Sequence, residues 1–160
     1  MAGEELNHNI RTIEKSILIR AQAEDIFFAL TDTDELVKWF PEGATTDPEL
    51  GGKYDFTWEK SKVWDHKRGI YTDIIPGTKV SFTWPVADLN QYTIVTFYLH
   101  SEGGYTTVIF SHTGFGFSEE WKNQYCEYAE LWSFFLENLR SYIEEGIDRR
   151  QEQEFKCTAK

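Results

Sequence analysis

The chain has 160 residues, of which 41% are hydrophobic and 27% charged, so it can form one globular core and its length predicts a single domain. Its formal net charge is −11, so it would repel a phosphate backbone or an anionic lipid surface, and we expect neither nucleic acid nor membranes as partners. Aromatic residues are unusually frequent, because 6 Trp, 8 Tyr and 12 Phe make up 16% of the chain.

The first third of the chain predicts one strand followed by two short helices. Isoleucines within 11–19 recur at steps of two or four residues, so they share one face of a strand. A short helix begins near Ala23. The polar residues 31–34 end this helix and supply the N-cap of a second short helix over Glu35–Trp39, which Pro41 ends.

From Ala44 onward the sequence predicts strands separated by turns. In Lys53–Glu59 aromatic residues alternate with polar ones, which is typical of a strand with one buried face. Tyr71 and Ile74 can point to the same side of their strand only if the strand contains a bulge. The other strands are expected near 45–47 and over 66–75, 79–84, 91–101 and 105–113, with loops at 60–65 and 85–90.

The last predicted element is a long helix from Ser118 to about Glu145. Ser118 is a suitable N-cap, and Glu119 and Glu120 suit the positive first turn. Apolar residues then recur at steps of three and four, so they form an arc wide enough to lie across a concave sheet. After Gly146 the sequence is charged and predicts a polar tail.

Together these elements predict an α+β fold in which the helices lie on one side of an antiparallel sheet. The order is strand, two short helices, six strands and a long helix. We expect one domain over 1–160, with an ordered core from about 10 to 146 and polar tails at both ends.

Cysteine usage and the absence of apolar segments indicate a compartment. Cys126 and Cys157 have no spacing that suggests a disulfide framework or a metal site, so reduced thiols are expected. No stretch approaches the ~18 apolar residues of a membrane span, and the first nine residues lack the apolar core of a secretory signal. We therefore expect a soluble, cytoplasmic protein.

Several short segments resemble a known family. They are Ala29–Asp32 (ALTD), Trp39-Phe40 and Gly51-Gly52 in the first third, and His112–Phe115 (HTGF) and Trp132–Leu139 (WSFFLENL) near the end. In order and spacing these segments resemble the proteins related to the activator of heat-shock-protein-90 ATPase, within the START-like or birch-pollen-allergen-like (SRPBCC) superfamily. The similarity extends from the first strand to the end of the long helix.

The resemblance implies the helix-grip fold, a curved antiparallel sheet wrapped around the C-terminal helix with a cavity between them. Members of the superfamily commonly bind small apolar or aromatic molecules. Some are cyclases, dehydratases or hydroxylase subunits, and the eukaryotic namesake of the family stimulates a chaperone. Fold alone does not decide among these functions.

The aromatic residues on the facing surfaces of sheet and helix are the candidate ligand site. Large flat side chains with a few polar groups typically form a pocket for a flat apolar ligand. The alternative is that these rings fill the space themselves as core. The predicted lining residues are Trp39, Phe40, Tyr54, Phe56, Trp58, Tyr71, Phe82, Trp84, Tyr128, Trp132 and Phe135. Trp64 is expected near the same faces but is not among the predicted lining residues.

Catalytic motifs with fixed spacing, such as GxSxG, HExxH and CxxC, are not present in the sequence. An enzyme of the cyclase or dehydratase type would need a polar pair inside the cavity, for example Asp73 with Arg68, or a tyrosine with His66. His100 and His112 lie near the ends of paired strands and could be neighbours, but no third metal ligand is evident.

These observations favour a small-molecule binding protein for a hydrophobic or aromatic ligand, without a metal or cofactor. The two alternatives are an enzyme of the cyclase or dehydratase type and a module that regulates a chaperone ATPase. The oligomeric state stays open.

Overall fold

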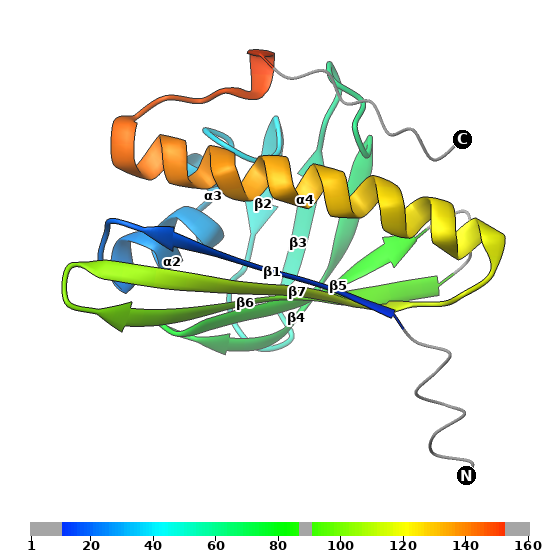
Figure 1. The fold of residues 1–160 in the computed structure, drawn as a ribbon, viewed down its shortest axis with the longest axis horizontal. Helices are drawn as coiled ribbons and strands as arrows, with labels where there is room; N and C mark the ends of the chain where they lie inside the picture. The colour runs from blue at the N-terminus through cyan, green and yellow to red at the C-terminus, as the bar shows by residue number, and fades with distance from the viewer. Residues whose placement is uncertain (1–10, 87–90, 153–160) are drawn as a thin grey trace, which may run out of the picture.

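One antiparallel sheet is the framework of the protein. The computed structural model describes residues 11–86 and 91–152. Within these residues the strands pair in the order β1-β7-β6-β5-β4-β3-β2, so the first strand lies beside the last (Figure 1). The strands are β1 (Arg11–Ile19), β2 (Gly43–Thr46), β3 (Lys53–Thr57), β4 (His66–Ile75), β5 (Lys79–Val86), β6 (Gln91–Glu102) and β7 (Tyr105–Phe115).

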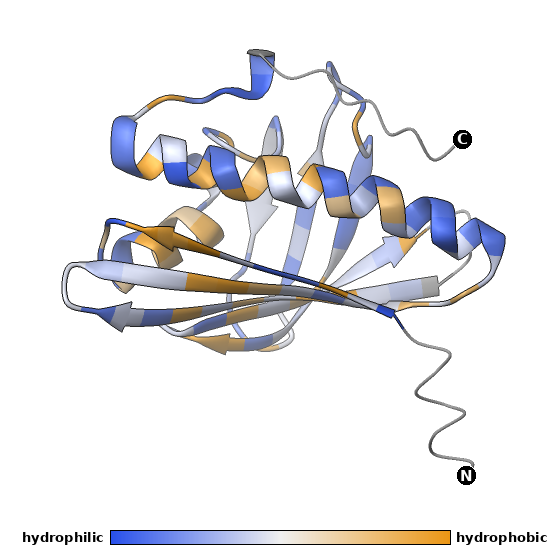
Figure 2. Ribbon diagram, in the orientation of Figure 1, coloured by the Kyte–Doolittle hydropathy of each residue, from blue (hydrophilic) through white to orange (hydrophobic). Residues whose placement is uncertain are grey.

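The long helix α4 (Glu119–Glu145) runs across the inner face of this curved sheet, as Figure 1 shows. The short helices α2 (Ala23–Thr31) and α3 (Thr33–Leu36) lie at one end of the sheet, and a 3-10 turn, η2 (Arg150–Glu152), follows α4. The first turns of α4 are hydrophilic, and apolar residues recur along the rest of it (Figure 2). The predicted α+β helix-grip fold is therefore confirmed.

The limits of α4 follow from local hydrogen bonding, as predicted. Ser118 has extended backbone angles, and its side chain accepts a hydrogen bond from the Trp121 amide at 3.4 Å, which caps the first turn. At the other end Gly146 adopts the left-handed conformation with φ 72°, and its amide donates to carbonyls of the last turn. Glycine suits this position because it has no Cβ to clash there.

β4 contains a bulge, a possibility that the sequence left open. The pairing of β4 with β5 shifts register between Tyr71 and Asp73, so Tyr71 points into the core while Asp73 is partly exposed. A bulge adds one residue to a strand and reverses the facing of the residues beyond it. The aromatic side chain of Tyr71 thereby joins those of β3 and β5.

Several element boundaries differ from the prediction. The second short helix begins at Thr33, because the Asp32 carboxylate caps it by accepting from the Glu35 amide at 3.1 Å. β2 ends at Thr46, and β5 continues through Pro85 to Val86, where the sequence predicted a loop. Pro85 pairs with Tyr92 of β6, although proline has no backbone N–H to donate to the sheet. Residues 87–90 of the predicted loop lie outside the described residues.

Candidate functional site

The predicted lining residues come together in the structure between the sheet and α4, and we call this set the aromatic cluster. Trp39 and Phe40 come from the segment after α3. β3, β4 and β5 with their flanking residues supply Tyr54, Phe56, Trp58, Tyr71, Phe82 and Trp84, and α4 supplies Tyr128, Trp132 and Phe135. Each of them is at most 4% exposed. All are core residues in this structure, and whether a ligand contacts them remains a prediction.

Phe40 links the two sides of the aromatic cluster. Its ring centroid lies 4.9 Å from that of Phe135 and 5.4 Å from that of Trp132, both on α4. On the sheet side it lies 5.3 Å from Trp58 and 5.6 Å from Phe56, both in edge-to-face geometry. Aromatic pairs favour such separations and tilts. The segment after α3 therefore lies between the sheet and the long helix.

Trp64, which the sequence placed in a polar loop near the faces that could line the cavity but not among the lining residues, packs into the aromatic cluster and is partly buried. Its indole stacks on Tyr128 with a centroid separation of 5.3 Å and an interplanar angle of 20°. It meets the rings of Trp84 at 4.9 Å and Trp58 at 5.2 Å edge-on. The signal in the sequence for its burial was a tryptophan among otherwise polar residues, because a large apolar ring is stabilised by being buried.

Two buried polar atoms in this region lack a hydrogen-bond partner among the described residues. They are Trp64 Nε1 and the Tyr71 hydroxyl. Burial raises the pKa of Tyr71, so its hydroxyl stays protonated and remains a donor. Buried polar groups are nearly always satisfied, and each exception points to strain or to a missing partner.

His112 is fully buried beside the aromatic cluster, and both of its ring nitrogens are bonded. Trp132 Nε1 donates to His112 Nδ1 at 3.0 Å, so the ring proton belongs on Nε2. Nε2 then donates to Thr93 Oγ1 at 2.6 Å, and Thr93 donates to the Trp84 carbonyl at 2.9 Å. Burial, and secondarily the Lys67 charge, hold the pKa of His112 well below its ordinary value. His112 therefore joins β7 to α4 as a neutral ring.

The neutral state of His112 predicts a pH dependence of stability. As the pH falls below about 6.5, His112 becomes protonated in the unfolded chain but stays neutral in the folded protein. Proton binding therefore stabilises the unfolded state relative to the folded one. We expect the free energy of unfolding to fall by about 1 kcal/mol between pH 7 and pH 5.5, measured by urea denaturation. In His112→Gln, whose amide can keep both hydrogen bonds, this part of the slope should disappear. An equal slope in both proteins would contradict the assignment.

His100 and His112, which the sequence allowed as possible neighbours, lie apart. His112 is opposite Val95 in the β6–β7 register, whereas His100 is opposite Thr107, nearer the β6–β7 turn. His100 is exposed. Across residues 11–86 and 91–152, no group of three or more histidine, cysteine or acidic side chains is arranged to hold a metal ion.

The polar pairs suggested for an enzyme do not form between the sheet and α4. Asp73 binds Lys79 at 2.8 Å instead of Arg68, and His66 Nε2 binds Asp55 Oδ1 at 2.7 Å. His66 and Arg68 are exposed. In the regular part of β4, which precedes the bulge, these alternate positions share the outer face of the sheet.

Lys67 is the polar residue of β4 that does point inward. Its ammonium donates to the Pro85 carbonyl at 2.6 Å and lies 5.7 Å from the Trp84 ring centroid and 5.9 Å from that of Tyr128. The residue is 8% exposed. A cation over two aromatic faces is electrostatically favourable, so the wall of the aromatic cluster contains one positive charge.

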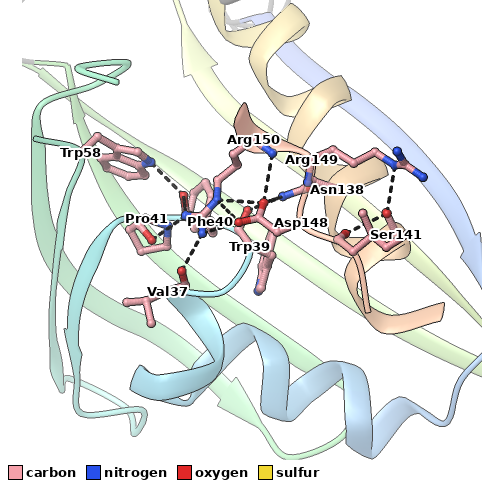
Figure 3. Close-up of polar contacts among 11 residues, drawn as sticks. Val37, Trp39, Phe40, Pro41, Trp58, Asn138, Ser141, Asp148, Arg149 and Arg150 are labelled. Atoms are coloured by element: carbon pink, nitrogen blue, oxygen red, sulfur yellow. Dashed lines mark hydrogen bonds and ion pairs between the residues drawn. The ribbon is translucent and has the colours of Figure 1, made fainter. Parts of the chain in front are cut away.

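The residues after α4 fold back onto the protein, so the polar tail begins later than predicted. Asp148, Arg149 and Arg150 form what we call the C-terminal clamp (Figure 3). The Arg150 guanidinium donates to the carbonyls of Val37, Phe40 and Pro41 at 2.7–3.0 Å. These carbonyls follow a short helix, so no helical amide donates to them and they need other donors. The sequence pattern did not reveal that Arg150 supplies these donors.

Buried Asn138 of α4 connects the C-terminal clamp to the aromatic cluster. Its side-chain amide donates to the Trp39 carbonyl at 2.8 Å and to Asp148 Oδ1 at 2.9 Å, and its oxygen accepts from the Arg149 amide at 2.6 Å (Figure 3). Burial opposes ionisation of Asp148, but hydrogen bonds, chiefly from Arg150 and Asn138, outweigh it and lower the pKa of Asp148. The segment that contains Trp39 and Phe40 is thus fixed from two directions.

We expect removal of the Arg150 guanidinium to destabilise the protein measurably. Arg150→Ala should lower the free energy of unfolding by about 1–3 kcal/mol, because partly buried carbonyls lose a charged donor. Arg140→Ala is a matched control, since Arg140 pairs with its neighbour Glu137 on the surface of α4, and should cost less than about 0.5 kcal/mol. Equal losses in urea denaturation would argue against the C-terminal clamp.

A surface hollow of about 440 Å³ lies next to the C-terminal clamp. It reaches Trp58 and Phe135 of the aromatic cluster. The other lining residues are Val37, Glu42, Lys60, Ser61, Asp148, Arg150 and Gln151. This hollow is a place where solvent approaches the edge of the aromatic cluster.

A curved antiparallel sheet that holds a long helix across an aromatic interior defines the helix-grip class of START-like proteins. This chain belongs to the family of Activator of Hsp90 ATPase homolog 1-like proteins, whose family model matches residues 20–144. No curated protein matches the chain. In the described residues, no helix combines the length and the apolar composition that a membrane crossing requires.

Solved structures share the fold at low sequence identity. Protein MLL2253 from Mesorhizobium loti has a TM-score of 0.74 at 20% identity, over 86% of this chain and 99% of that one. The Aha1 dimer from Colwellia psychrerythraea has a TM-score of 0.72 at 24% identity, over 85% and 98% of the two chains. CalU16 from Micromonospora echinospora has 0.71 at 19% identity, over 89% and 80%. At these identities the likeness concerns the fold alone.

Proposed function

We propose that this protein binds a small hydrophobic or aromatic molecule between its sheet and α4. The observation that carries the proposal is the aromatic cluster, in which rings from the strands, from α4 and from the segment after α3 face one another. Pockets for flat apolar ligands have such walls with few polar groups. Tyr71 could orient a ligand, because its buried hydroxyl has no partner among the described residues.

The test is native mass spectrometry of the purified full-length protein, followed by a thermal-shift screen with aromatic, lipid and polyketide-like compounds. We expect a co-purifying small molecule, or a midpoint that rises with ligand concentration as linkage requires. A clean mass without any thermal shift would contradict the proposal and favour rings that fill their own space.

Two variants locate the binding. Phe135→Leu removes one ring from the wall of the aromatic cluster and should weaken binding several-fold. Tyr98→Ser changes an aromatic residue that is 45% exposed on the outer face of the sheet and should leave binding unchanged. The reverse pattern would place the compound on the outer face and contradict the proposal.

A second candidate function is the regulation of a chaperone ATPase, which the description of the family suggests. The observation that favours it is an exposed apolar patch on the outer face. Tyr98 is directly opposite Ile109, and Leu18 lies on the neighbouring strand β1. Such patches often mark protein contacts. Capture of purified Hsp90, reduced by Tyr98→Ser, would support this candidate, and no enrichment of the chaperone would count against it.

A cytoplasmic location remains part of this proposal. It is supported by the cysteines, because the spacing of Cys126 and Cys157 gives no sign of a disulfide framework. Labelling of the thiols in freshly lysed cells would show whether they are reduced.

A further inference from the structure

Trp64 lies where the proposed ligand would lie. Phe40, Trp132 and Phe135 place their ring centroids 6.0, 5.3 and 5.6 Å from its own. Together with Tyr128, Trp58 and Trp84, these rings surround a single indole. They come from the segment after α3, from β5, from α4 and, for Trp58, from the start of the loop 58–65, which also contains Trp64.

The loop 58–65 has an exposed tip and a buried base. It closes on itself through hydrogen bonds from the Trp58 amide to the Asp65 carbonyl at 2.7 Å and from the Lys62 amide to the Trp58 carbonyl at 3.0 Å. Residues 59–62 and Asp65 are exposed. The Glu42 carboxylate accepts from two further loop amides, at 2.7 and 2.9 Å. Two rings of this loop point inward, Trp58 at its first residue and Trp64 near its end.

The inserted position of Trp64 has local costs. Lys62 and Asp65 adopt left-handed backbone angles, with φ 57° and 61°, which non-glycine residues rarely adopt. Trp64 Nε1 is buried, and no described residue accepts its hydrogen bond. All of these costs could be relieved if the loop left the aromatic cluster. The packing of the Trp64 indole against the aromatic cluster offsets these costs.

The loop also borders open space. Lys60 and Ser61 line the 440 Å³ surface hollow, which extends to Trp58 and Phe135 on the edge of the aromatic cluster. A ligand that entered from this hollow would contact the loop together with Trp58 and Phe135.

We propose that Trp64 is a built-in occupant of the ligand site, which a flat bicyclic aromatic molecule displaces. The inference rests on the proposed function and deepens it by naming the ligand class. The space that Trp64 fills has the shape of two fused rings, stacked on Tyr128 and enclosed by ring edges. Because no described acceptor faces Trp64 Nε1, the ligand needs no donor at that edge.

Benzothiophene tests this inference, because it has the shape of indole without the N–H. Trp64→Ala should bind it at least tenfold more tightly than the wild-type protein, since the occupant no longer competes. The matched control is Trp121→Ala, which removes a partly buried indole packed on Phe115, away from the loop. Its affinity should equal that of the wild type. If Trp64→Ala does not fold, Trp64→Leu replaces it, with an expected gain of at least threefold.

Hydrogen exchange of the wild-type protein separates displacement from simple cavity filling. With benzothiophene bound, amides of 59–65 should exchange faster while those of α4 exchange more slowly. Binding with unchanged loop exchange, or equal affinity of Trp64→Ala and wild type, would overturn the displacement and leave the proposed function intact. If neither protein bound benzothiophene and the wider screen also found no ligand, both proposals would fall.

Discussion

Trp132→Ala is expected to remove about half of the stability of the protein. Trp132 is fully buried, and its ring packs on two others. Its ring centroid lies 4.6 Å from that of Phe110 in β7 and 5.5 Å from that of Trp84 in β5. Loss of a buried indole costs about 3–5 kcal/mol, and His112 Nδ1 loses its donor as well, which costs about 1–3 kcal/mol more. A domain is stable by about 5–15 kcal/mol in total, so urea denaturation should show a large drop in midpoint or no folded protein.

Two further variants of α4 control this result. Trp121→Ala removes a partly buried indole from the same helix and should cost no more than about 2 kcal/mol. Trp132→Phe keeps much of the ring volume but loses the N–H, so its cost should lie between the other two. If Trp132→Ala were no more harmful than Trp121→Ala, the central place of Trp132 in the packing of α4 on the sheet would be wrong.

Asn138→Asp is expected to destabilise the protein by about 3 kcal/mol or more, although it changes the shape of the side chain very little. The amide of Asn138 donates to the Trp39 carbonyl and to Asp148, and a carboxylate can do neither. The new charge would also be buried and would face the Asp148 carboxylate, which is unfavourable. The free energy of unfolding from urea denaturation at pH 7 measures the effect.

Asn123→Asp is the matched substitution for this experiment. Asn123 is exposed near the N-terminus of α4, where a negative charge is tolerated or slightly favourable. It should change the free energy of unfolding by less than about 0.5 kcal/mol. An equally small effect of Asn138→Asp would show that the connection between the C-terminal clamp and the aromatic cluster through Asn138 contributes nothing to stability.

The sequence predicted the regular elements well, because their signals are local. Alternation in Lys53–Glu59, the cap at Ser118 and the glycine at 146 each depend on residues a few positions apart. The facing of β4 stayed open, because Tyr71 and Ile74 cannot share a face of a regular strand, and the structure resolves it with a bulge. The same patterns identified the rings that the structure brings together in the aromatic cluster.

Features that depend on distant partners were missed or only partly predicted. The sequence placed Trp64 in a polar loop near the faces that could line the cavity, but only the closed fold shows six rings around it. Lys67 follows exposed His66 on β4, so nothing local shows that its ammonium reaches the Pro85 carbonyl. Arg150 lies more than a hundred residues from the carbonyls that it binds. Such contacts depend on tertiary geometry, which periodicity does not encode.

The most direct test of a ligand site between sheet and α4 is a two-dimensional ¹H–¹⁵N NMR titration of the tryptophan indoles. The chain has 6 Trp, and each gives one Nε1–H signal that single substitutions can assign. With a compound from the screen, the signals of Trp58, Trp84 and Trp132 should shift together, while that of Trp121 stays in place. Shifts confined to Trp121, or no shift at saturating compound, would contradict a ligand site in the aromatic cluster.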